Sequence, residues 1–130
     1  DDINLDLRKK WVFISTVAGA TTLFSCSLGD IVKTDFGKKI IIDLLNECRS
    51  IAQLYKYDYE DSEADIILKT ITISGSPIKA SMQRDVEKNS FTEHEQIFGD
   101  LITKGKKYNF DCPILMSCYV RMNVYQRNLT

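Results

Sequence analysis

Four cysteines and one histidine are the side chains of this sequence best suited to nucleophilic, redox or metal chemistry. The cysteines are Cys26, Cys48, Cys112 and Cys118. No two of them form a C-x-x-C pair, and no other cysteine or histidine lies near His94, so a zinc site of the usual ligand spacing is not expected. We expect each cysteine to be a small buried apolar residue. His94 stands between Glu93 and Glu95, which indicates a solvated side chain rather than a catalytic base.

Two charged segments are the next candidates for binding chemistry. Residues 57–64 carry four carboxylates, but the glycine and the bidentate glutamate of a calcium-binding EF-hand loop are missing, which favours a solvated loop. The basic run of Lys104, Lys106 and Lys107 is typical of a solvated turn, although it could touch phosphate or acidic lipid. No G-x-S-x-G, Gly-rich phosphate loop or H-E-x-x-H motif occurs. The sequence therefore predicts no catalytic, cofactor-binding or metal-binding residues, and no cofactor.

The elements that would position any site begin with a charge-free stretch over residues 11–29. A helix that spans a bilayer needs about 20 apolar residues, and this stretch reaches that length. Arg8, Lys9 and Lys10 precede it, so we predict a polar and basic N-terminal arm over residues 1–10 and a transmembrane helix over residues 11–29. Two alternatives remain open: a buried segment of a soluble core, and a lipoprotein signal in which Cys26 would be acylated.

The clearest amphipathic segment covers residues 35–56. Its apolar residues recur at intervals of three and one, as on one face of a helix. They are Ile41, Leu44, Leu45, Cys48, Ile51, Ala52 and Tyr55. Thr34 is expected to cap this helix at its N-terminus. The apolar face needs a partner, and we expect that partner to be a sheet.

Short alternating segments predict that sheet. Residues 65–74 and 78–83 flank the turn Gly75-Ser76-Pro77, residues 96–103 give a third strand, and a fourth begins at Tyr108. Residues 114–124 alternate most regularly, which places Val120 on the buried face and Tyr119 on the other. The predicted fold class is thus α+β: residues 34–130 form one small domain, with a helix packed on a mostly antiparallel sheet.

The predicted packing of helix on strand leaves open whether two of the cysteines form a disulfide. Cys48 lies on the apolar face of the predicted helix and Cys118 on that of the last strand, so the two sulfurs could come within bridging reach. Two buried thiols are the alternative. Cys112 and Cys118 cannot bridge, because six residues of straight strand separate them by about 20 Å.

A basic turn followed by Tyr-x-Phe-Asp resembles a feature of one mitochondrial group. The matching residues are Lys104, Gly105, Lys107, Tyr108, Phe110 and Asp111. With the order of span, helix and sheet, the chain resembles the single-span Tim-twenty-one subunit of the presequence translocase and its relative, cytochrome oxidase assembly factor one. Cys112-Pro113 departs from the pattern, since it interrupts the strand. The resemblance implies an N-terminus in the matrix and a domain in the intermembrane space.

The expected function follows from the span, the resemblance and the absence of catalytic motifs. It is a non-catalytic scaffold, assembly factor or accessory subunit of a respiratory-chain or protein-import complex in the mitochondrial inner membrane. The expected partners are that membrane-embedded complex and the lipid bilayer. A net charge of −1 gives no basic field for nucleic acid, and no small-molecule substrate is expected. The alternative is a membrane-anchored lipoprotein or secreted binding domain, and a small hydrolase comes third.

Overall fold

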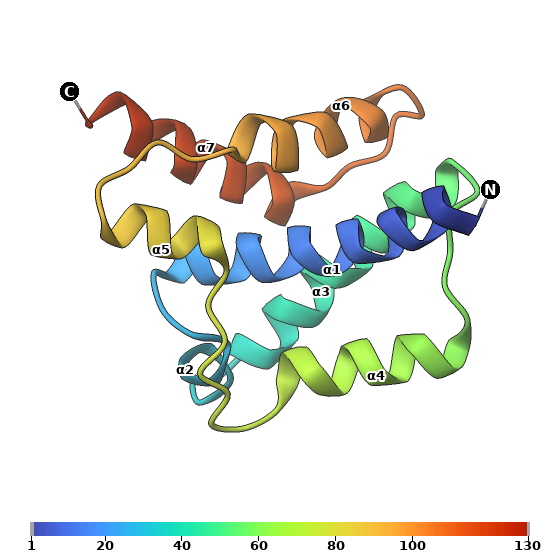
Figure 1. Ribbon diagram of the computed structural model, residues 1–130, viewed down its shortest axis with the longest axis horizontal. Coiled ribbons are helices and arrows are strands. Elements are labelled where there is room, and N and C mark those ends of the chain that lie inside the picture. Colours follow the sequence, from blue (N-terminus) through green and yellow to red (C-terminus); the bar gives the residue numbers. More distant parts are fainter. Residues whose placement is uncertain (1, 130) are drawn as a thin grey trace.

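The computed structural model describes residues 2–129, with side chains described from Trp11 onward. All regular elements in this part of the chain are helices (Figure 1). They are α1 (Asp2–Phe24), α2 (Leu28–Val32), α3 (Gly37–Leu54), α4 (Asp61–Thr72), α5 (Ser81–Glu87), the π-helix η1 (Glu95–Gly99), α6 (Asp100–Lys106) and α7 (Pro113–Arg127). The predicted α+β class is therefore wrong, because helices occupy every segment that was expected to form the sheet.

Helix α1 is the central element, with α3, α5, α7 and η1 packed around it (Figure 1). Residues 15–22 are buried without interruption. Gly19 lies at the crossing of α1 with α3 and α7, where a Cβ atom would stand 2.9 Å from Leu44 Cδ2 and 3.1 Å from Cys118 Sγ. The small side chain of Gly19 thus allows three helices to approach closely at this point.

The predicted transmembrane helix over residues 11–29 is wrong. Within residues 2–129, no helix combines the length and the apolar character that crossing a bilayer requires. Residues 11–24 are instead the inner part of α1, which is apolar because protein surrounds it. Thr16, Thr21 and Thr22 are buried there, and each donates its hydroxyl hydrogen to the backbone carbonyl four residues earlier, at 2.7–2.9 Å.

The N-terminal arm predicted over residues 1–10 coincides, from Asp2 onward, with the first turns of α1. Asp1 and the side chains of residues 2–10 lie outside the described part of the structure. The basic residues Arg8, Lys9 and Lys10 therefore have a described backbone only.

The amphipathic helix predicted over residues 35–56 is confirmed as α3, and six of its seven stripe residues are buried. Its expected partner is wrong, since α3 packs on α1 and α7 rather than on a sheet. The predicted cap is also wrong. Thr34 donates its hydroxyl hydrogen to the carbonyl of Ile31 at 2.7 Å, and Phe36 occupies the N-cap position with a left-handed φ of 70°.

The predicted strand over residues 114–124 is helix α7. Pro113 opens it at a position where a helix tolerates a missing amide hydrogen, and the carboxylate of Glu47 accepts the next two, from Ile114 at 3.1 Å and Leu115 at 2.8 Å. The buried face consists of Leu115, Cys118 and Met122, whereas Val120 is 58 % exposed. The prediction that Val120 is buried is therefore wrong, because period-two alternation does not describe a helix.

The other predicted strands are also wrong. Residues 65–74 fall mostly in α4, which begins with Asp61 and Glu63 at its positive end and carries Lys69 near its negative end. Residues 78–83 are an extended segment followed by the first turn of α5, and residues 96–103 belong to η1 and α6. Favourable charges at the ends of α4 and packing against α2 and α3 outweigh the β-branched composition.

Candidate functional site

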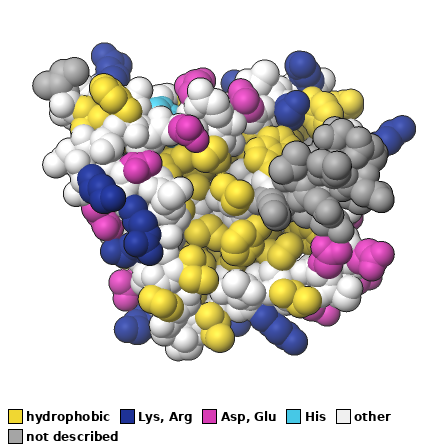
Figure 2. Space-filling view, viewed as in Figure 1, with side chains coloured by type: hydrophobic (Ala, Val, Ile, Leu, Met, Phe, Trp, Pro, Cys, Tyr) yellow, Lys and Arg dark blue, Asp and Glu magenta, His cyan; other side chains and the backbone are white. Residues whose placement is uncertain are grey.

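One groove opens onto α1 and is called the central groove here. It encloses about 270 Å³ between α1, the segment before α5 and η1. The lining residues are mostly apolar. They are Phe13, Ile14, Val17, Ala18, Ile78, Lys79, Ala80, Ser81, Met82 and Ile97. Hydrophobic side chains also gather across the middle of the face that Figure 2 shows, where α1 crosses the molecule.

The floor of the central groove contains an exposed residue of α1. Between Val12 and Thr22, Ile14 is the single residue classed as exposed, and 47 % of it is accessible. Val17 and Ala18 are buried beside it, one helical turn further on. Ile14 lies beside the half-buried Phe13, Ile78 and Ile97, and a contiguous apolar surface of this kind marks a ligand or protein contact.

The opposite wall is an extended segment that backbone hydrogen bonds hold against α1 and α2. The carbonyls of Ser76 and Ile78 accept hydrogen bonds from the amides of Gly29 and Leu28, both at 2.9 Å. The amide of Ala80 donates to the hydroxyl of Thr21 at 3.3 Å. Three contacts along five residues therefore fix the position of this wall relative to α1.

Two polar side chains of the described residues line the central groove, and both belong to that wall. Lys79 is paired with Glu87, with Nζ and Oε2 2.9 Å apart, and this hydrogen bond keeps the pKa of Glu87 below its usual range. A lysine ammonium has three donors, so the pair leaves Lys79 able to bind a further acceptor. Ser81, the first residue of α5, is exposed and adds a hydroxyl group. The groove thus has an apolar floor on α1 and an opposite wall in which Lys79 and Ser81 stand among the apolar residues Ile78, Ala80 and Met82.

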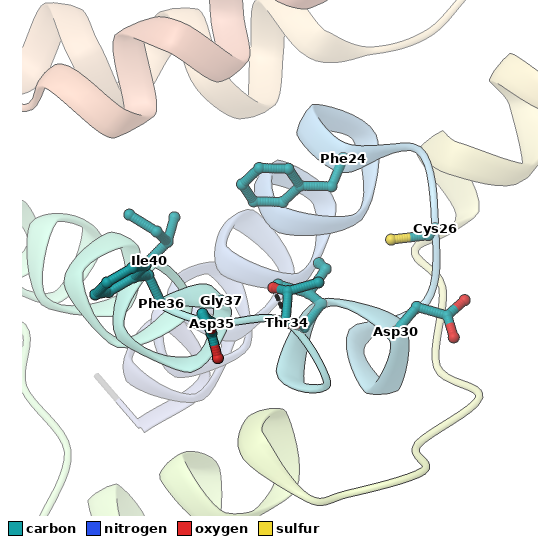
Figure 3. Close-up of a pocket in the computed structure, with 9 residues that line it drawn as sticks. Phe24, Cys26, Asp30, Thr34, Asp35, Phe36, Gly37 and Ile40 are labelled. Atoms are coloured by element: carbon teal, nitrogen blue, oxygen red, sulfur yellow. Dashed lines mark hydrogen bonds between the residues drawn. The ribbon is translucent and has the colours of Figure 1, made fainter.

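A second cavity, called the end pocket here, lies where α1 ends and α3 begins (Figure 3). It encloses about 350 Å³. The ring of Phe24 faces Phe36 and Ile40 across it, and Asp30 and Asp35 also contribute to its lining (Figure 3). With two carboxylates and no cation among its described lining residues, the end pocket is less suited to an anion than the central groove.

The single histidine is structural. His94 is 2 % exposed, with Nδ1 2.8 Å from the hydroxyl of Thr92 and Nε2 2.8 Å from Oδ1 of Asn123. The expectation that it is solvated is wrong, because the flanking Glu93 and Glu95 point to solvent while the imidazole points into the molecule. His94 is not among the residues that line either cavity.

The four cysteines are free thiols, so the bridge between Cys48 and Cys118 that the sequence left open is not formed. Cys48, Cys112 and Cys118 are buried, as expected. Burial raises the pKa of Cys48 to about 12 and that of Cys112 to about 11, which keeps both thiols protonated and poorly nucleophilic at neutral pH. Cys26 is half-buried and borders the end pocket.

The charged segments have structural partners. The acidic stretch pairs with α3, since Asp58 Oδ1 accepts a hydrogen bond from Arg49 Nε at 2.8 Å. The basic run ends α6, and the ammonium of Lys104 lies 5.0 Å from the centre of the Tyr55 ring. Across the described residues, no three His, Cys, Asp or Glu side chains gather where they could hold a metal ion.

The residues of the central groove are the ones that sequence reasoning missed. Ile14 was assigned to a membrane span, and Ile78 and Ser81 were assigned to a strand. The groove has no sequence motif, because three segments far apart in the chain form it and most of its side chains are apolar. The helical arrangement alone brings these segments together.

These features define a class: an all-helical domain, over the described residues, that wraps a buried central helix and leaves one side of it open. Comparison with known proteins gives the family. The profile of the family described as "Ketopantoate reductase PanE/ApbA C terminal" matches residues 2–126. The chain therefore belongs to the family of ketopantoate reductase PanE/ApbA C-terminal domains.

Comparisons with individual proteins agree with this family. The uncharacterized oxidoreductase YkpB of Bacillus subtilis is 31 % identical over 124 residues, which cover 95 % of this chain and 41 % of YkpB. The dimeric ketopantoate reductase of Staphylococcus aureus has the same fold, with a TM-score of 0.84, 20 % identity and coverage of 98 % of this chain and 45 % of that one. D-mandelate dehydrogenase, solved with NADH, gives a TM-score of 0.81 at 22 % identity, over 100 % of this chain and 45 % of that one. The chain thus spans less than half the length of each of these relatives.

Family membership overturns the functional interpretation made from the sequence. The resemblance to the translocase subunit and the oxidase assembly factor was wrong, because it depended on an order of span, helix and sheet that residues 2–129 do not have. Three predictions that followed from it are also wrong: the non-catalytic scaffold, the membrane-embedded partner complex and the mitochondrial inner-membrane location. The exclusion of an enzyme is wrong as well. The family is one of oxidoreductases.

Proposed function

We propose that this chain is the C-terminal domain of a reductase that converts a small 2-oxo acid to the 2-hydroxy acid with NADH or NADPH. The support is its family, together with what its relatives bind. D-mandelate dehydrogenase was solved with NADH and anilino(oxo)acetate, an anionic 2-oxo acid derivative. In the proposed reaction, a hydride passes from the nicotinamide to the oxo carbon and a proton reaches the oxygen, so the nucleotide leaves oxidised.

The nucleotide itself does not fit the residues described here. Dinucleotides usually bind where a strand runs through a Gly-rich turn into a helix, with the pyrophosphate on the helix N-terminus. Residues 2–129 contain helices without strands, and the sequence has no Gly-rich phosphate loop. We therefore assign nucleotide binding to the part of a full-length protein that corresponds to the remaining half of its relatives.

The central groove is the feature that carries the proposed role of this domain, which is to form one wall of the substrate site. A 2-oxo acid has an anionic head and a side chain, and the groove has two polar groups on the wall opposite an apolar floor. The carboxylate is suited to Lys79 and Ser81, and the side chain is suited to Ile14 and Val17 on α1. The carboxylates at the end pocket would repel the same anion.

The test is an assay of the full-length protein that contains this chain, in which oxidation of NADH or NADPH is followed with a panel of 2-oxo acids. We expect saturable oxidation that depends on the 2-oxo acid. Ile14→Trp fills the floor of the groove and should lower kcat/KM by about 100-fold, because a substrate displaced by an ångström reacts that much more slowly.

Ile66→Trp is the matched control, since Ile66 is 64 % exposed on α4 and is not among the lining residues of the central groove. It should leave kcat/KM unchanged. Oxidation that does not depend on any 2-oxo acid would refute the proposed reaction. Equal effects of the two tryptophan variants would refute the role of the groove.

A further inference from the structure

We propose that the central groove selects 2-oxo acids whose side chain is wholly apolar, branched or aromatic, and discriminates against those that carry a hydroxyl group on the side chain. This inference rests on the proposed function and names the substrate class of the same site. It separates this protein from a reductase of 2-dehydropantoate, whose side chain ends in a hydroxymethyl group.

The distribution of polar atoms around the groove carries the inference. Both polar lining side chains, Lys79 and Ser81, lie on the wall that leads into α5, where they suit the carboxylate and the oxo group. The α1 side presents Phe13, Ile14 and Val17, which have no side-chain donor or acceptor. Among the residues whose side chains the structure describes, no Asn, Gln, Asp, Glu, His or Tyr lines the groove.

The backbone amides and carbonyls on the α1 side are already hydrogen-bonded within the protein. The helix is continuous from Asp2 to Phe24, so the amides and carbonyls around Ile14 bond to one another. Further along α1, the hydroxyl of Thr21 donates to Val17 O at 2.8 Å and accepts from the Ala80 amide at 3.3 Å. A substrate hydroxyl placed against α1 would therefore lose its water without gaining a partner.

The size of the groove agrees with an apolar group as large as a phenyl ring. An apolar cavity of roughly 150 Å³ binds benzene, and the central groove offers about 270 Å³. The exposed Ile14 and the half-buried Ile78 and Ile97 supply the branched surfaces that such a side chain would cover. Covering Ile14 also removes exposed apolar area from water, which favours an apolar substrate further.

The experiment compares two substrates of the same shape with the full-length protein. They are 2-dehydropantoate and 3,3-dimethyl-2-oxopentanoate, in which a methyl group replaces the hydroxyl. We expect kcat/KM to be about 100-fold higher for the dimethyl-oxopentanoate, the ratio typical of an apolar pocket confronted with an added hydroxyl. A ratio near one, or a preference for the hydroxylated acid, would overturn the specificity inference while leaving the proposed reaction standing.

Variants locate the discrimination in the groove. Ile14→Asn supplies a donor and an acceptor at the floor and should lower the ratio at least about tenfold, chiefly by improving kcat/KM for 2-dehydropantoate. Ile66→Asn, the exposed control on α4, should leave the ratio unchanged. A ratio that Ile14→Asn does not alter would overturn the inference, because the substrate side chain would then lie elsewhere. Failure to reduce any 2-oxo acid would overturn the proposed function and, with it, this inference.

Discussion

Replacement of Gly29 by alanine should displace the wall of the central groove. Gly29 is the second residue of α2, and its amide donates to Ser76 O at 2.9 Å. A Cβ atom at this position would lie 2.4 Å from that oxygen and 2.5 Å from the Ser76 nitrogen, far inside van der Waals contact. Because the obstacle is backbone, no rotamer change relieves it, and the extended segment before α5 must move away.

The magnitude follows from what that movement breaks. The two backbone hydrogen bonds from Leu28 and Gly29 are worth about 0.5–1.5 kcal/mol each, and an overpacked contact costs about 1–3 kcal/mol. The higher helix propensity of alanine returns about 1 kcal/mol. We expect Gly29→Ala to lower the free energy of unfolding by about 1–5 kcal/mol, a large share of the 5–15 kcal/mol typical of a domain.

Urea unfolding followed by circular dichroism measures this change. Lys33→Ala, at an exposed position just after the same helix, is the control and should stay within about 0.5 kcal/mol of the parent protein. Since Ile78 and Ser81 belong to the displaced wall, KM for a 2-oxo acid should also rise in Gly29→Ala. A Gly29→Ala protein as stable as the parent would refute the close approach of α2 and this segment.

Substitutions at four further positions test other parts of the structure. Glu47→Ala removes the acceptor of two amides at the start of α7 and should cost about 1–2 kcal/mol in urea unfolding. Burial raises the pKa of Glu47 above its usual 4.5 in the folded state. The free energy of unfolding of the parent protein, relative to that of Glu47→Gln, should therefore be largest below pH 4.5 and decline as the pH rises through the raised pKa. The opposite slope would contradict this assignment. Leu115→Asp should destabilise by more than about 4 kcal/mol, whereas Val120→Asp should cost less than about 0.5 kcal/mol, and thermal unfolding in the reverse order would reject the register of α7. Phe36→Gly should raise Tm, because the left-handed backbone at Phe36 costs a non-glycine residue about 1 kcal/mol, and a lower Tm would show that the ring contributes more than the strain.

The amphipathic helix α3 was predictable from the sequence, because one of its faces is buried and the other meets water. Ile41, Leu44 and Cys48 repeat at helical spacing, and polar residues separate them. Helix α1 was misread for the converse reason. Neighbouring elements surround most of its length, so residues 15–22 show no polar face. The Thr hydroxyls that bond within the helix distinguish it from a lipid-facing segment.

Helix α7 was misread because it is apolar on two sides. Leu115, Cys118 and Met122 face the core, while Val120 and Val124 are exposed. The two sets interleave and imitate a period of two. The central groove could not be predicted at all, since its floor and its opposite wall are more than fifty residues apart in the sequence and its apolar side chains form no motif.

A crystal structure of the full-length protein with oxidised nucleotide and a 2-oxo acid would test most directly that the central groove forms one wall of a reductase substrate site. We expect the carboxylate to lie within hydrogen-bond distance of Ser81 or Lys79, with the substrate side chain in contact with Ile14 and Val17 on α1. A 2-oxo acid bound at the end pocket beside Phe24 and Phe36, or bound without touching this domain, would contradict the account.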